Sequence, residues 1–161
     1  MDCKILFLKE QKYMGIKTKI LYKEHDEIDF GKLQLNVINS DIKNRDIEER
    51  FIAMDSEFLP DSFQYTPFVP VTSFEGEEYD RFTRAEGEYY CFRVPLKELG
   101  PKWFQECNKY IEQNNLKIDR KFDLEYYDED YLSFIKSEDF NIYEQTTCII
   151  FRKLNETEDT E

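Results

Sequence analysis

The sequence has one histidine, His25, which lies in the polar run KEHDE at residues 23–27. A Ser-His-Asp triad needs a histidine held between a nucleophile and a carboxylate, and a typical zinc site draws on several histidines or cysteines. A lone histidine among charged residues supplies neither arrangement. We therefore exclude hydrolysis by such a triad, and we expect neither a metal site nor a cofactor.

Cysteines are few and scattered. The four of them, Cys3, Cys91, Cys107 and Cys148, form no C-x-x-C pair, and the last three lie within apolar patterns. This spacing is typical of buried free thiols in a reducing compartment, and it does not indicate a disulfide framework.

Basic residues are outnumbered. The chain has 22 Lys and Arg against 35 Asp and Glu, a formal net charge of -13, and no run of basic residues forms a stripe. Nucleic-acid phosphates would be repelled, so direct nucleic-acid binding is excluded. The same charge would concentrate small cations near the surface, although it also serves plain solubility.

Long apolar runs are absent. The N-terminal run at residues 5–8 is too short for the apolar region of a signal peptide, and no stretch approaches the ~20 apolar residues of a membrane-spanning helix. We expect no membrane association and a cytoplasmic location.

Aromatic residues are abundant, at 16% of 161 residues, and the hydrophobic fraction is 40%. This composition argues against disorder and favours one α+β domain over residues 1–153. The remaining segment, 154–161, is acidic and low in apolar residues, and we expect it to be a disordered tail.

The apolar patterns predict seven strands and two helices. Pro101 near a helix start, with Trp103, Cys107 and Ile111 on one side at helical spacing, predicts the helix over 100–114. Pro67 and Pro70 cannot donate to a ladder, so the strand containing them is predicted to be an edge strand or only partly paired. The strands are predicted at 3–9, 12–22, 50–59, 63–74, 87–96, 121–127 and 141–153, and the other helix at 30–42.

The order strand, helix, strand, strand occurs twice, apart from the first short strand. It predicts two βαββ units, about residues 1–76 and 77–153, separated by the polar break at 75–78. We expect these duplicated units to pair about a pseudo-twofold axis, with antiparallel sheets and two helices flanking a central ligand cleft.

The run FDLEYY at residues 122–127 alternates between two faces if it is a strand. Phe122, Leu124 and Tyr126 form a core-like face, and Asp123, Glu125 and Tyr127 fall on the opposite face, which presents Glu125 beside Tyr127. A carboxylate flanked by a phenol suits an organic cation. The alternative is that Glu125 is simply solvated, as most strand glutamates are.

Three short motifs resemble the GyrI-like small-molecule-binding domain, which is also the effector domain of AraC-type and MerR-type multidrug regulators. They are YMG at 13–15, GEYYCF at 87–92 and FDLEYY at 122–127, and the similarity extends over residues 11–153. The sequence leaves no room for a helix-turn-helix, so the resemblance implies a stand-alone binding domain.

The resemblance also implies a site. Glu125 matches the family glutamate that pairs with lipophilic cations inside an aromatic-walled pocket. We expect its candidate walls to be Trp103, Tyr90, Phe92, Tyr127 and Tyr143. Each ring could equally belong to the ordinary core.

Two further functions remain open. Some GyrI-like proteins resemble hydrolases that open strained electrophilic rings, and Glu125 as base with Tyr127 or Tyr143 as acid would suit that chemistry. A gyrase-inhibitor-like interaction module is the other alternative, in which the acidic loop at 128–138 and the tail would dock a protein partner.

Overall fold

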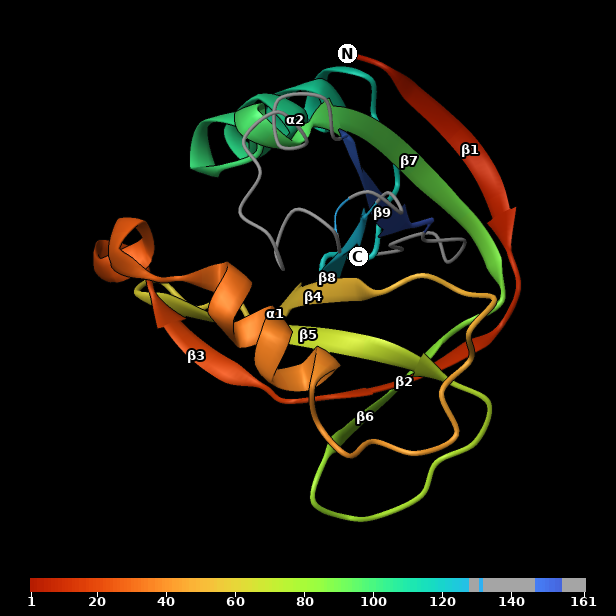
Figure 1. Ribbon diagram of the computed structural model, residues 1–161. Coiled ribbons are helices and arrows are strands. Elements are labelled where there is room, and N and C mark those ends of the chain that lie inside the picture. Colours follow the sequence, from red (N-terminus) through yellow and green to blue (C-terminus); the bar gives the residue numbers. More distant parts are fainter. Residues whose placement is uncertain (128–130, 132–146, 155–161) are drawn as a thin grey trace.

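The computed structural model describes residues 1–127, 131 and 147–154, and it shows the predicted α+β fold (Figure 1). Within the described residues, two α-helices and two short 3₁₀ helices accompany the strands. The helices are η1 (Tyr22–Glu27), α1 (Phe30–Ile38), η2 (Leu96–Glu98) and α2 (Pro101–Gln113). The strands are β1 (Cys3–Leu8), β2 (Gln11–Gly15), β3 (Thr18–Leu21), β4 (Ile52–Ser56), β5 (Ser62–Val71), β6 (Asp80–Arg84), β7 (Gly87–Pro95), β8 (Phe122–Tyr127) and β9 (Thr147–Lys153).

The described strands form one antiparallel sheet of nine strands in the order β1-β7-β9-β8-β4-β5-β2-β6, with β3 paired to β5. The prediction of separate sheets was wrong. The reason is the pairing of β4 with β8, in which Ala53 lies opposite Glu125 and Asp55 opposite Asp123. This pairing satisfies backbone groups that would otherwise lie at two open edges. Strand β6 was not predicted.

The sheet curls strongly. The rings of Phe82 on β6 and Phe122 on β8 lie 5.6 Å apart, although β2, β5 and β4 separate these strands in the sheet order. The inner face of this curl holds an apolar cluster that includes Tyr13, Phe68, Tyr89, Leu124 and Phe151. The residues predicted as the core face of the run 122–127 contribute to this cluster.

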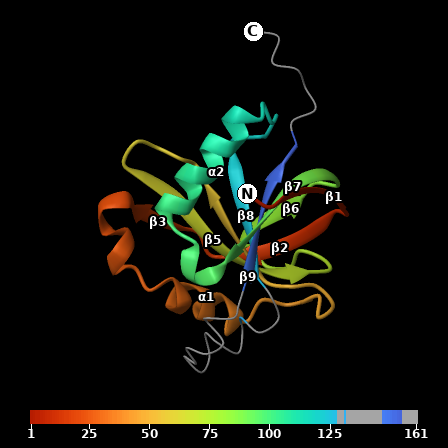
Figure 2. The same cartoon turned by 90° about the horizontal axis from the view of Figure 1, so that it is seen from above.

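The other face of the sheet packs against both α-helices. Val37 of α1 and Cys107 and Ile111 of α2 are fully buried in the larger core cluster. Figure 2 shows α2 lying across the sheet, with α1 to one side of it. The apolar stripe predicted for residues 100–114 is therefore the buried side of α2.

Helix α1 begins where Asp29 accepts a hydrogen bond from the backbone N–H of Lys32. It ends at Ile38, four residues earlier than predicted. The guanidinium of Arg45 donates to the carbonyl oxygens of Ile38, Ser40 and Ile42 at 2.6, 2.8 and 3.1 Å. These bonds satisfy carbonyl groups that a continued helix would have used, so the chain can turn away.

The predicted strand over 12–22 divides into β2 and β3 at Ile16 and Lys17, and Gly15 lies at the division. A Cβ atom at Gly15 would lie 2.0 Å from the carbonyl oxygen of Pro67. Only glycine allows β2 and β5 to approach this closely.

Strand β5 is an interior strand, so of the two predicted alternatives the edge strand was wrong and the partial pairing is what the structure shows. It pairs with β4 on one side and with β3 and β2 on the other. Pro67 falls between the residues paired to β3, 62–65, and those paired to β2, 68–71. Pro70 lies beyond the residues paired to β4, 64–68, and its carbonyl accepts from Asp46 N–H at 2.9 Å. Both prolines thus stand where one neighbouring ladder is interrupted.

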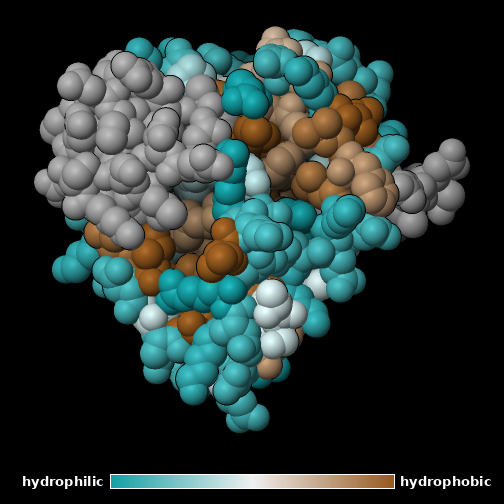
Figure 3. All heavy atoms as spheres, turned by 45° about the vertical axis from the view of Figure 1, so that its right-hand side comes forward, coloured by the Kyte–Doolittle hydropathy of each residue, from teal (hydrophilic) through white to brown (hydrophobic). Residues whose placement is uncertain are grey.

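Strand β1 ends the sheet and leaves Ile5, Leu6 and Phe7 exposed. The view in Figure 3, turned so that the β1 side of the molecule comes forward, shows apolar patches among hydrophilic residues. Cys91 and Cys107 are buried free thiols, and burial raises their pKa values to about 12 and about 11. No helix within the described residues is long and apolar enough to cross a membrane.

Candidate functional site

A cavity of about 820 Å³ lies between the two helical regions, η1 with α1 and the start of α2, over the sheet face formed by β5, β4, β8 and β9. Its wall is rich in aromatic rings from separate parts of the chain. These rings include Phe30, Phe63, Tyr65, Phe104, Tyr127 and Tyr131. A space of this size with a mostly apolar wall is suited to a small organic molecule.

Ionisable groups gather on the sheet side of this cavity. Asp55, Asp123, Glu125 and Arg152 all line it, and they are only 6%, 8%, 7% and 4% exposed. Strand alternation places Asp123 and Glu125 on one face of β8, and the register sets Asp55 of β4 opposite Asp123. The site is therefore built by neighbouring strands from distant parts of the sequence.

Asp123 is neutralised by Arg152. The guanidinium contacts both carboxylate oxygens, with Nε 2.9 Å from Oδ1 and Nη2 3.0 Å from Oδ2. Arg152 also donates to Asn108 Oδ1 of α2 at 2.6 Å. Burial raises the pKa of Asp123, and the Arg152 charge opposes that rise. A two-point ion pair of this kind has fixed geometry and holds the guanidinium in place.

Asp55 and Glu125 form a second carboxyl pair without such neutralisation. Burial raises the pKa of Asp55 well above its ordinary value, and the Glu125 charge and a hydrogen bond to Glu125 raise it further. This shift, which the Arg152 charge partly opposes, favours a protonated Asp55 whose hydroxyl donates to the Glu125 carboxylate. The pair then carries one negative charge in a largely dehydrated wall.

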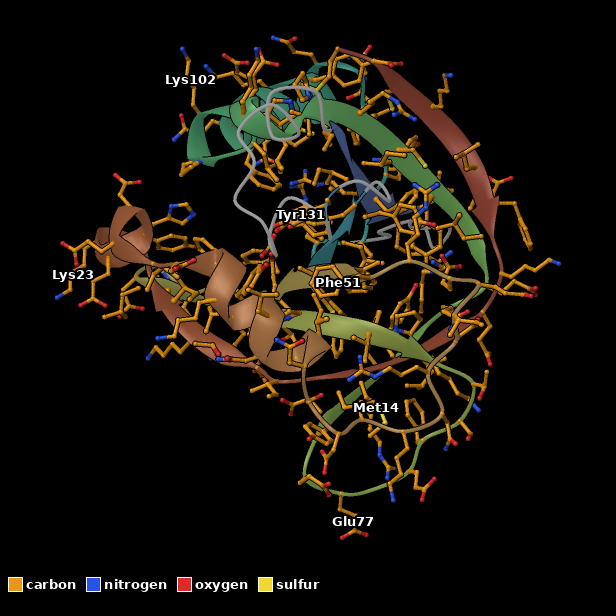
Figure 4. All side chains as sticks on the ribbon, in the orientation of Figure 1. Met14, Lys23, Phe51, Glu77, Lys102 and Tyr131 are labelled. Carbon is orange, nitrogen blue, oxygen red and sulfur yellow. The ribbon has the colours of Figure 1, made fainter. Side chains whose placement is uncertain are left out.

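Tyr127 holds Glu125 from the other side. Its hydroxyl donates to Glu125 Oε1. Its ring stacks on Phe51 at a centroid distance of 5.7 Å and lies tilted against Tyr131 at 4.1 Å. Figure 4 shows Tyr131 and Phe51 in the interior of the molecule, while Lys23 and Lys102 lie at its outside. This packing orients the phenol so that it fixes the carboxylate.

A neutral polar chain closes the α1 side of the cavity. Gln34, 1% exposed, donates from Nε2 to the Tyr65 hydroxyl at 2.6 Å and accepts from the Tyr131 hydroxyl. Burial raises the pKa of Tyr65 well above its ordinary value. The Tyr65 phenol therefore stays uncharged, and the charge of the buried part of the wall is carried by the carboxyl groups and Arg152.

The predicted site residues that the structure describes separate into two groups. Glu125 and Tyr127 line the cavity together. Trp103 and Phe92 pack against each other in the core, with ring centroids 6.4 Å apart, and half-buried Tyr90 packs against the same core; none of the three lines the cavity. Tyr143 and the acidic loop at 128–138 fall outside the described residues, apart from Tyr131.

Sequence reasoning missed Asp55, the Asp123–Arg152 pair, Gln34 and the ring of Phe104. The available signal was a charge inside an apolar strand, since Asp55 ends the run FIAMD at 51–55 and Arg152 follows the run CIIF at 148–151. Charged residues are seldom buried without a partner, so such positions indicate either a strand end or a site.

Within residues 1–127, 131 and 147–154, no group of three or more histidine, cysteine or carboxylate side chains is placed to hold a metal ion. The carboxyl pair instead offers a fixed negative charge between ring faces. Such an arrangement can hold an organic cation by Coulomb attraction and cation–π contact.

The sequence matches no protein-family model and no curated protein. Solved structures do match over nearly the whole chain. SAV2435, in a structure bound to tetraphenylphosphonium, has a TM-score of 0.66 at 16% identity, with 100% of this chain and 98% of that chain covered. The C-terminal domain of EcmrR has a TM-score of 0.62 at 8% identity, with 97% and 98% covered.

A third structure, a hydrolase from Listeria innocua, has a TM-score of 0.52 at 12% identity, with 95% of this chain and 91% of that chain covered. The chain therefore has the fold of the GyrI-like effector-binding domains, which confirms the resemblance at the level of the fold. One fold can serve unrelated activities, so the chemistry of the site and not the fold determines what the protein does.

Proposed function

We propose that this protein binds lipophilic, often cationic, small molecules of the multidrug type, with Glu125 as the counter-ion. The observation that carries the proposal is a carboxylate 7% exposed on the wall of a ring-lined cavity of about 820 Å³. The tetraphenylphosphonium bound to SAV2435, which has the same fold, supports this class of ligand.

The expected interaction energies are large enough for micromolar binding of an organic cation. A carboxylate about 4 Å from a cation contributes roughly 4 kcal/mol at an effective dielectric constant of about 20. Each well-placed ring face adds about 0.5–2 kcal/mol. Micromolar affinity requires about 8 kcal/mol net, so one glutamate and a few rings reach it after the entropy loss of binding. Ring faces and a single charge impose little shape, which suits a broad range of ligands.

The strand order supports the proposal of two related halves around this cleft, about 1–76 and 77–153. If β1, β2, β4 and β5 are exchanged with β6, β7, β8 and β9 in that order, the sheet order β1-β7-β9-β8-β4-β5-β2-β6 reads the same from its other end; β3, which pairs with β5 beside this order, has no counterpart among the described strands. Each half begins with a strand that pairs with the other half, β1 with β7 and β6 with β2. The repeated unit we infer is thus one strand longer than the predicted βαββ.

Titration with tetraphenylphosphonium tests the binding function. Trp103 packs 5.2 Å from the ring of Phe104, which lines the cavity, so its fluorescence reports occupancy. We expect saturable binding that weakens at least about tenfold in Glu125→Gln, because a roughly 4 kcal/mol attraction is lost in part. Glu106→Gln, an exposed site on α2, is the matched control and should bind like the wild type. Equal affinity in Glu125→Gln would overturn the counter-ion role.

One observation favours a second function. The hydrogen bond from Tyr127 to Glu125 provides a phenol and a carboxylate at one point of the cavity, as opening of a strained electrophilic ring requires. Incubation with styrene oxide separates the two functions. Diol formation that is lost in both Glu125→Gln and Tyr127→Phe would establish a hydrolase, and absence of turnover beside intact cation binding would leave a binding protein.

A further inference from the structure

The cavity wall holds one more carboxyl group than a single-charge ligand requires. Arg152 neutralises Asp123 through two contacts of 2.9 and 3.0 Å. Asp55 and Glu125 remain, both less than 8% exposed and both lining the cavity. With both ionised, the buried part of the described wall would carry two uncompensated negative charges.

The groups that surround Asp55 do not cancel the charge of the Asp55–Glu125 pair, so this pair determines the net charge of the buried part of the wall. Asp55 faces Glu125 and the Asp123–Arg152 pair on β8 and β9, and Tyr65 on β5. Tyr127 and Tyr131 add neutral phenols. His25 on η1 and Arg120 before β8 also line the cavity, and Arg120 is exposed, so solvent screens its charge.

The two carboxyl groups also occupy related places. Strand β4 (Ile52–Ser56) can be aligned with the first five residues of the longer strand β8 (Phe122–Tyr127). In this alignment Asp55 takes the position of Glu125. Each half of the sheet thus contributes one carboxyl group from the same point of its middle strand. This placement puts the pair where β4 and β8 meet, within reach of one ligand.

We propose that the cavity binds organic dications by releasing to solvent the proton held between Asp55 and Glu125, and binds monocations without releasing it. This inference rests on the proposed function and names its ligand class further. A single positive charge is balanced by the protonated pair, which carries one negative charge. A second positive charge is balanced only when the Asp55 proton leaves through the cavity mouth to the buffer.

Two flat ligands of nearly equal shape provide the test. N-methyl-4-phenylpyridinium carries one fixed charge, and methyl viologen carries two. Neither has a proton to lose near pH 7. Calorimetry in phosphate and in Tris, buffers with different ionisation enthalpies, gives the number of protons released per ligand bound. We expect methyl viologen to release close to one proton more than N-methyl-4-phenylpyridinium, because its second charge favours the ionised form of Asp55.

The variant Asp55→Asn tests whether the released proton comes from Asp55. This near-isosteric change should abolish the difference in proton release and weaken methyl viologen at least about tenfold, while the monocation stays within about threefold. Equal proton release by the two ligands in the wild type would overturn the proposal, as would a difference that persists in Asp55→Asn. If neither ligand nor tetraphenylphosphonium binds, the proposed function itself fails. If the monocation binds and the dication does not, only this inference fails.

Discussion

Asp55 is the residue whose protonation links the stability of the fold to the cavity. Its pKa is raised first by burial and then by Glu125, because both disfavour a second negative charge on the wall. Between its ordinary value of 3.8 and the raised value, the folded protein binds more protons at Asp55 than the unfolded chain does. The contribution of Asp55 to stability therefore falls as pH rises through that window.

This sign predicts a pH-dependent effect of Asp55→Asn. An asparagine does not ionise, so the variant should gain stability relative to the wild type as pH rises from the ordinary Asp pKa of 3.8 to the raised pKa, by at most about 1.4 kcal/mol per pH unit. Urea unfolding of both proteins across this range measures the difference. A stability difference that stays constant with pH would show that Asp55 ionises as freely in the folded state as in water.

Glu125 and Tyr127 show what residue patterns predict well. Alternation along 122–127 placed Asp123, Glu125 and Tyr127 on one face, because the side-chain period of a strand is local. The role of Asp55 could not be predicted, because its place in the site depends on the pairing of β4 with β8, which joins residues about 70 positions apart. Trp103 shows a second limit of sequence patterns. Helical spacing identifies the apolar side of a helix, but it does not distinguish residues of the core from residues of the cavity wall.

At the scale of elements, the close approach of β2 and β5 at Gly15 holds one end of the sheet together. Strand β2 ends at this residue, and β3 follows after two residues; both strands pair with β5. The predicted single strand over 12–22 failed here because the constraint comes from the Pro67 carbonyl, which is distant in sequence.

Gly15→Ala should therefore destabilise the fold. A Cβ atom 2.0 Å from a backbone oxygen cannot be relieved by a rotamer change, so β2 must shift. We expect a loss of about 1–3 kcal/mol, which in a chain of this size lowers Tm by several degrees. Thermal unfolding followed by circular dichroism measures it. Gly100→Ala is the control, because nothing lies within 4 Å of a Cβ atom there, and its Tm should change less. Equal Tm losses in both variants would contradict the steric account.

At the scale of the whole molecule, the net charge of -13 and the buried pair act at different ranges. Surface charges attract a cation during diffusion and are screened by salt, whereas the pair at Glu125 acts at contact inside the cavity and is screened little. The fold resemblance was predictable from three motifs, but the single curled sheet was not, because strand pairing across the halves leaves no local signal.

This division of roles predicts how salt affects binding of tetraphenylphosphonium. Raising the ionic strength from about 20 to 300 mM should slow association several-fold and change dissociation much less, since the Debye length shrinks from about 20 to 6 Å. Stopped-flow fluorescence of Trp103 measures both rates. A salt effect confined to the dissociation rate would mean that the bound cation lies in open solvent.

Tetraphenylphosphonium and tetraphenylborate, two ions of nearly the same shape and opposite charge, test whether Glu125 is the counter-ion of the cavity. Equilibrium titration of the wild type should show the phosphonium bound at least about a hundredfold more tightly, because its charge meets the Glu125 carboxylate instead of being repelled by it. In Glu125→Gln that preference should shrink by at least about tenfold. Equal affinity for the two ions in the wild type would show that the cavity selects ligands only by shape and apolar surface, and that Glu125 is not its counter-ion.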